Sequence, residues 1–131
     1  MSKPLALVAD DDTAVRNLIR EMLASDGWET LSACDGQEAL EMLEQSAEPV
    51  QLLVTDMYMP KTNGMELIKA VNSTHPDIPV LVVTAYNFDM DIPPEGFKGR
   101  MQLLPKPFSM KVLLQTAQTL LNNTTPPASV A

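Results

Sequence analysis

Residues 5–12 read LALVADDD, and this stretch decides the fold. Its five apolar residues are too few for a helix, and an unbroken apolar run is typical of a strand that is covered on both faces. Three consecutive aspartates follow at the point where this strand ends. A buried strand with an acidic carboxyl end indicates a parallel sheet whose ligands bind beyond one edge.

The rest of the chain alternates between short apolar runs and longer amphipathic ones. We expect further strands at Trp28–Cys34, Val50–Thr55, Ile78–Val83 and Met101–Leu104, and the first of these is weakly apolar, which suits a sheet edge. Four stripes of apolar residues recur at helical spacing: Val15, Leu18, Ile19, Met22 and Leu23; Ala39, Leu40 and Leu43; Leu67, Ile68 and Val71; and Val112, Leu113, Ala117, Leu120 and Leu121. This alternation predicts an α/β fold with a five-stranded parallel sheet and right-handed crossovers.

One segment breaks the alternation. A helix is expected between Ala85 and Arg100, but Pro93-Pro94 would end it within two turns. We therefore predict a short or distorted fourth helix there, followed by loop. Residues 1–122 are expected to form one domain. Residues 123–131 contain two prolines and no charged side chain, so we expect a disordered tail or the start of a linker.

The composition excludes several classes of protein. The chain has 131 residues, 45% of them hydrophobic, which suits a single domain. Its net charge of -8 would repel phosphate backbones, so we expect no direct binding of nucleic acid by this domain. The one cysteine, Cys34, excludes an internal disulfide and a thiolate metal cage. We expect no membrane insertion and a cytoplasmic protein, because no apolar run approaches about 20 residues and no signal peptide is recognisable.

Polar side chains gather at the carboxyl ends of the predicted strands. Each closes or follows a different strand: Asp10-Asp11-Asp12 the first, Asp56 the third, Thr84 the fourth and Lys106 the fifth. Two carboxylates about 4 Å apart repel by about 4 kcal/mol at an effective dielectric constant near 20, so a cation or bound protons must offset them. Taken singly, these residues are helix caps, loop acids or a solvated lysine. Together, their oxygen atoms favour Mg2+ or Mn2+ over zinc.

The same residues resemble those of a known family. The resemblance rests on four signatures in order: Asp10-Asp11, Asp56-Met57-Tyr58-Met59-Pro60 with Gly64, Thr84-Ala85, and Lys106-Pro107-Phe108. These look like the receiver domain of two-component response regulators, of the chemotaxis-regulator type, over about residues 4–122. The resemblance implies a flavodoxin-like, doubly wound sheet with the strand order 2-1-3-4-5.

The resemblance also implies a role for each site residue. Asp56 would be the phosphoacceptor for a sensor histidine kinase or phosphotransfer protein. Asp11 and Asp56 would ligate Mg2+ directly together with the backbone carbonyl of Tyr58, and Asp10 would hold the metal through water. The phosphoryl-binding and switch residues would be Thr84, Ala85 and Lys106, with a cis bond between Lys106 and Pro107.

Phosphorylation in this family changes a surface that binds a downstream protein partner or a second copy of the chain. Two features depart from the family pattern at that surface: Leu103 replaces an aromatic switch residue, and Pro93-Pro94 lies in the expected fourth helix. We also hypothesise that Tyr58 and Tyr86 flank the path of a hydrolytic water and slow the loss of the phosphoryl group.

The expected function is a phosphoacceptor switch rather than a turnover enzyme, with slow autodephosphorylation. A phosphatase of the haloacid dehalogenase type places an acid two residues after its nucleophile, where this chain has Tyr58. A flavin carrier needs a glycine-rich phosphate loop after the first strand, where the aspartates would repel the phosphate. The alternative that stays open is a receiver-like interaction module whose output does not depend on phosphorylation.

Overall fold

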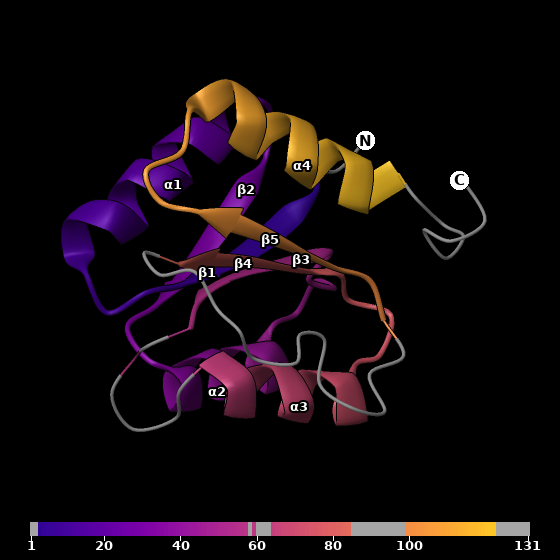
Figure 1. The fold of residues 1–131 in the computed structure, drawn as a ribbon. Coiled ribbons are helices and arrows are strands. Elements are labelled where there is room, and N and C mark those ends of the chain that lie inside the picture. Colours follow the sequence, from indigo (N-terminus) through magenta and orange to yellow (C-terminus); the bar gives the residue numbers. More distant parts are fainter. Residues whose placement is uncertain (1–2, 58, 60–63, 85–98, 123–131) are drawn as a thin grey trace.

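The computed structural model describes residues 3–57, 59, 64–84 and 99–122, and its core is one parallel sheet (Figure 1). The strands are β1 (Leu5–Ala9), β2 (Glu29–Ala33), β3 (Leu52–Asp56), β4 (Val80–Thr84) and β5 (Met101–Pro105). The helices are α1 (Thr13–Ser25), α2 (Gly36–Gln45), α3 (Gly64–Thr74) and α4 (Met110–Asn122). All four strand pairings are parallel, in the order β2-β1-β3-β4-β5, which confirms the predicted topology.

Helices cover both faces of the sheet, with α1 and α4 on one side and α2 and α3 on the other (Figure 1). The side chains of β1 alternate between the two faces: Leu5, Leu7 and Ala9 pack with α2 and α3, and Ala6 and Val8 pack with α1 and α4. Every residue of β1 and β4 is buried. Double coverage therefore explains why the central strands are uninterrupted apolar runs.

Local side-chain bonds begin the first two helices at the carboxyl edge of the sheet. Asp12 caps α1 by accepting hydrogen bonds from the backbone N–H groups of Ala14 and Val15. Asp35 caps α2 by accepting from the N–H of Glu38, whose carboxylate accepts in turn from the N–H of Cys34. The reciprocal bonds at α2 resemble a capping box. The two caps begin both helices at that edge.

The strands begin later than the apolar runs predict. The sequence places their starts at Trp28, Val50 and Ile78, whereas β2, β3 and β4 begin at Glu29, Leu52 and Val80. The three earlier residues are buried in the approach to each strand, since burial extends beyond the hydrogen-bonded ladder. Trp28, for example, donates its backbone N–H to the Leu23 carbonyl at the end of α1.

The buried parts of the apolar stripes on α1 and α4 are narrower than the sequence pattern predicts. Leu18 and Val112 are 47% and 42% exposed, although both were expected on buried faces. They lie at the margins of stripes whose centres, such as Ile19 and Leu113, fill the core. Cys34, which follows the last residue of edge strand β2, is exposed.

Two predictions fall on residues that the structure does not describe. The short or distorted helix that is predicted between β4 and β5 falls on residues 85–98, and the predicted tail falls on residues 123–131. Within the described ranges, none of the helices combines the length and apolar character that a bilayer crossing requires.

Candidate functional site

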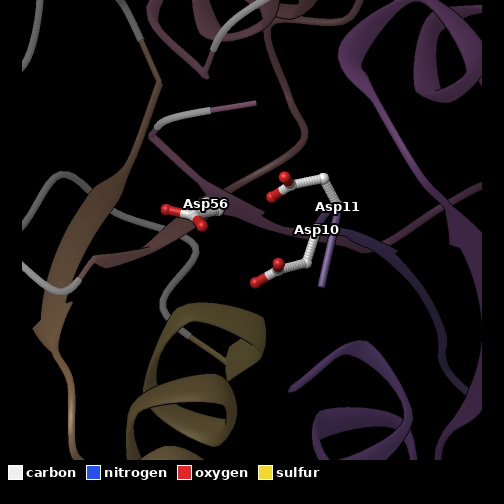
Figure 2. Close-up of side chains that lie close together, drawn as sticks. All are labelled: Asp10, Asp11 and Asp56. Atoms are coloured by element: carbon white, nitrogen blue, oxygen red, sulfur yellow. The ribbon is translucent and has the colours of Figure 1, made fainter. Parts of the chain in front are cut away.

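The fold brings three aspartates together at the carboxyl edge of the sheet. β1 and β3 are neighbours with Ala9 in register with Thr55, so the residues that follow each of these emerge side by side. Carboxylate oxygens of Asp10, Asp11 and Asp56 lie within 4.8 Å of one another (Figure 2). The convergence predicted from the sequence is therefore confirmed.

Asp10 is the most buried member of this acidic cluster, with 1% of its surface exposed. Its Oδ1 accepts a hydrogen bond of 2.9 Å from the backbone N–H of Asp12, and its own N–H donates to the Ala33 carbonyl. Burial raises the pKa of the Asp10 carboxyl above its ordinary value, and the charge of Asp56 acts in the same direction. The hydrogen bond from Asp12 and the charge of Lys106 oppose that rise without cancelling it.

Lys106, which follows edge strand β5, brings a positive charge to the acidic cluster. Its Nζ lies 3.4 Å from Oδ2 of Asp10 and 3.4 Å from Oδ2 of Asp56. The backbone holds this position, since the Lys106 N–H donates a hydrogen bond to the Thr84 carbonyl over 2.7 Å. The Lys106–Pro107 bond is cis, as expected. Lys106 thus places one positive charge beside the three clustered carboxylates.

Thr84 is the last residue of β4 and is fully buried, in register with Pro105 at the end of β5. It therefore closes the strand beside β3 at the same edge as the acidic cluster. Ala85, Tyr58 and Tyr86, which the sequence also predicts to be site residues, lie outside the described residues.

Arg16 also belongs to the site, although the sequence patterns did not indicate it. Its Nη1 donates a 2.7 Å hydrogen bond to the backbone carbonyl of Asp10, and its Nη2 lies 3.3 Å from Oγ1 of Thr13. The guanidinium group thus ties the first turn of α1 to the backbone that carries Asp10 and Asp11. The only signal in the sequence is a basic residue one turn beyond the helix cap, because a bond to a carbonyl leaves no residue pattern.

The donor set fits a hard divalent cation. All three clustered side chains offer oxygen, and Asp35, the nearest further buried acid in the sequence, caps α2 instead. Oxygen ligands of this kind suit Mg2+ or Mn2+. Asp56 has 13% of its side chain exposed, whereas Asp10 is enclosed.

The sequence matches one protein family over most of its length. The model of the response regulator receiver domain matches residues 6–118. The chain is 32% identical over 130 residues to the DNA-binding transcriptional regulator NtrC of Azospirillum brasilense, covering 99% of this chain and 27% of that protein. It is 37% identical over 120 residues to the response regulator MprA of Mycolicibacterium vanbaalenii, covering 92% and 51%. The chain thus spans about half or less of the length of these relatives.

Solved structures match the same region. The chemotaxis protein CheY4 of Vibrio cholerae superposes with a TM-score of 0.81 at 29% identity, covering 92% of this chain and 100% of that one. A response regulator receiver domain protein of Clostridium thermocellum superposes with a TM-score of 0.82 at 26% identity, covering 91% and 94%. The family match includes the acidic cluster, Thr84 and Lys106. The chain therefore belongs to the response regulator receiver domain family.

Proposed function

We propose that this chain is the phosphoacceptor switch of a two-component system and that Asp56 receives the phosphoryl group. The observation that carries the proposal is the geometry around Asp56, where Asp10, Asp11 and the Lys106 ammonium gather at one edge of the sheet. Receiver domains are phosphoacceptor switches rather than turnover enzymes, and the donor would be a sensor histidine kinase or a phosphotransfer protein. In this proposal the chain works in the cytoplasm.

The reaction requires little from the protein beyond position and charge. A carboxylate oxygen of Asp56 forms a bond to phosphorus as the bond from phosphorus to the donor's imidazole nitrogen breaks, and the imidazole leaves with the electron pair. Lys106 Nζ, 3.4 Å from the Asp56 carboxylate, is close enough to pair with the transferred oxygens. The hydroxyl of Thr84, which closes the neighbouring strand, would donate to the same oxygens.

The acidic cluster would hold Mg2+, with Mn2+ as a substitute of similar ligand preference. Asp11 and Asp56 would ligate the ion directly, Asp10 through water, and the backbone carbonyl of Tyr58 would complete the protein ligands. When bound, the ion supplies positive charge beside the transferred phosphoryl oxygens. The convergence of three carboxylates within 4.8 Å of one another supports this assignment.

The switch would act through Thr84 and Lys106. Drawing both toward the phosphoryl group would bias the backbone that follows β4 and β5, because Lys106 joins the end of β5 to the approach to α4. The exposed apolar side chains of Leu103 and Val112 lie on β5 and α4, which suits contact with a downstream protein or a second copy. Ala85, Tyr58 and Tyr86 would line the same site, with the two tyrosine rings slowing hydrolysis.

Leu103 favours a second candidate function. This side chain occupies the position of the family's aromatic switch residue, is 41% exposed and has no hydroxyl to relocate. The chain would then be an interaction module whose output does not follow phosphorylation.

Labelling tests the acceptor directly. With Mg2+ and radiolabelled acetyl phosphate, the folded wild-type protein should acquire a hydroxylamine-labile label, because acyl phosphates react with hydroxylamine. Asp56→Asn should lose the label, and Asp12→Asn should keep it, since asparagine still caps α1. A wild-type protein that remains unlabelled contradicts the proposed function.

Magnesium should raise the thermal stability of the wild type, because a ligand that binds only the folded protein stabilises it. At a concentration 100 times the dissociation constant, the gain is about 2.7 kcal/mol. Asp11→Asn should lose most of the gain, and the neighbouring Asp12→Asn should retain it, because Asp12 lies outside the acidic cluster. Melting curves with Mg2+ and with a chelator measure the difference. Equal gains in both variants would exclude Asp11 as a ligand.

Asp10→Asn should stabilise the metal-free protein near neutral pH by a few degrees. The folded state raises the pKa of Asp10, so it binds the proton more tightly than the unfolded chain, and the ionised carboxylate destabilises the fold. This penalty fades as pH falls through the raised pKa toward the ordinary value, and the advantage of asparagine should shrink with it. Asparagine can still accept the hydrogen bond from Asp12. A lower melting temperature for Asp10→Asn at neutral pH would reverse the assigned sign.

Beryllofluoride with Mg2+ separates the switch from the constitutive module. As a phosphoryl mimic on Asp56, it should change amide hydrogen exchange in residues 101–122 of the wild type and leave Asp56→Asn unchanged. If exchange over β5 and α4 is the same with and without the mimic, although the mimic binds, the constitutive module is correct.

A further inference from the structure

The first residue of α3 lies against the backbone of Asp56 itself. A Cβ built on Gly64 would stand 2.4 Å from the carbonyl oxygen of Asp56, 2.6 Å from Cα of Met57 and 3.0 Å from the carbonyl oxygen of Met57. All three of these atoms are backbone atoms, so no flexible side chain can move aside. Only glycine allows this contact between α3 and the end of β3.

Space, rather than conformation, requires glycine at position 64. Gly27 has a φ of 90°, in the left-handed region, whereas Gly64 has an ordinary helical backbone. A glycine within a helix costs stability relative to alanine, so its presence in α3 needs a different reason. The close approach to Asp56 and Met57 supplies that reason. The Gly64 N–H also donates a 2.8 Å hydrogen bond to the Met57 carbonyl.

Thr55 holds the same carbonyl of Asp56 by a hydrogen bond. Its Oγ1 donates to the Asp56 carbonyl oxygen over 2.9 Å, and its side chain is fully buried in β3. Met57, the residue after Asp56, is anchored by its side chain, which is 2% exposed and packs in the core beneath α2 and α3. We call these three residues, Thr55, Met57 and Gly64, the acceptor clamp.

We propose that Thr55 and Gly64 are positioning residues for phosphoryl transfer, which fix the peptide after Asp56 and thereby the direction of its carboxylate. This inference rests on the proposed role of Asp56 as acceptor. A displacement of that peptide would shift Cα of Asp56, and with it Cβ and the carboxylate, relative to Asp10, Asp11 and Lys106. Catalysis of phosphoryl transfer depends on alignment, and a displacement of about 1 Å can cost about 100-fold in rate.

Gly64→Ala and Gly27→Ala form a matched pair. Nothing lies within 4 Å of the Cβ position of Gly27, so alanine there strains the turn between α1 and β2 without touching the site. The experiment measures the saturating rate constant for labelling by acetyl phosphate, written kcat here, and the acetyl phosphate concentration that gives half of it, written KM. Calorimetry measures the Mg2+ affinity, at a temperature where circular dichroism shows both variants folded. Gly64→Ala should lower kcat about 10-fold to 100-fold. Gly27→Ala should melt at a lower temperature and label at the wild-type rate.

Thr55→Val and Thr55→Ser test the clamp without a change of backbone. Valine keeps the shape of threonine but lacks the hydroxyl, and should lower kcat about 10-fold, while serine should restore it. If Gly64→Ala does not fold, this pair decides alone. Wild-type kcat in both Gly64→Ala and Thr55→Val, or loss in Gly27→Ala equal to that in Gly64→Ala, overturns the inference.

Failure of the proposed function is a different result. In that case the wild-type protein itself takes no label, and the Mg2+ affinity of the same variants then tests the clamp. Weaker binding in Gly64→Ala and Thr55→Val, with wild-type binding in Gly27→Ala, would support it. Unchanged affinity in all three variants would overturn it.

Discussion

Mutual repulsion among three carboxylates is the constraint on which the rest of this structure depends. Asp10, Asp11 and Asp56 come within 4.8 Å at the edge of the sheet, and Asp10 is enclosed there. Such a cluster opposes folding, and the pKa of Asp10 is raised first by burial of its carboxyl and then by the charge of Asp56. The apolar core on both faces of the sheet must outweigh it. A cation bound at this site would offset the negative charge of the cluster.

Several contacts limit this repulsion without removing it. Lys106 approaches two of the acids, but at 3.4 Å its ammonium group makes only long ion pairs with them. Arg16 bonds to the Asp10 backbone rather than to its carboxylate, so it fixes the turn that carries Asp10 and Asp11. In the proposed switch, Lys106 would move from these two acids toward the new phosphoryl group.

The elements that hold the site differ in how rigidly they are embedded. Two residues hold the end of β3. Thr55 does so through a fully buried side chain, and Gly64 through a backbone contact that leaves no room for a methyl group. On β5, by contrast, Leu104 is buried while Gln102, Leu103 and Pro105 are exposed. In the proposed switch, chemistry at the firmly held end of β3 would alter the surface at the sparsely covered edge strand β5.

The sequence by itself determined the parallel sheet, its double coverage and the identity of the acidic side chains, because periodicity and strand-terminal residues are local patterns. Residues 5–12 already contain a buried strand and its acidic end, and the alternation of the remaining segments indicated the parallel sheet, whereas its strand order, β2-β1-β3-β4-β5, was implied by the family resemblance. Only the tertiary structure decided which apolar residues are covered, since the exposure of Leu18 and Val112 depends on where neighbouring elements end. It also decided the roles of Arg16, Thr55 and Gly64. Arg16 and Thr55 donate hydrogen bonds to carbonyl oxygens, and Gly64 leaves room for neighbouring backbone atoms. Contacts of these kinds produce no periodic pattern in a sequence.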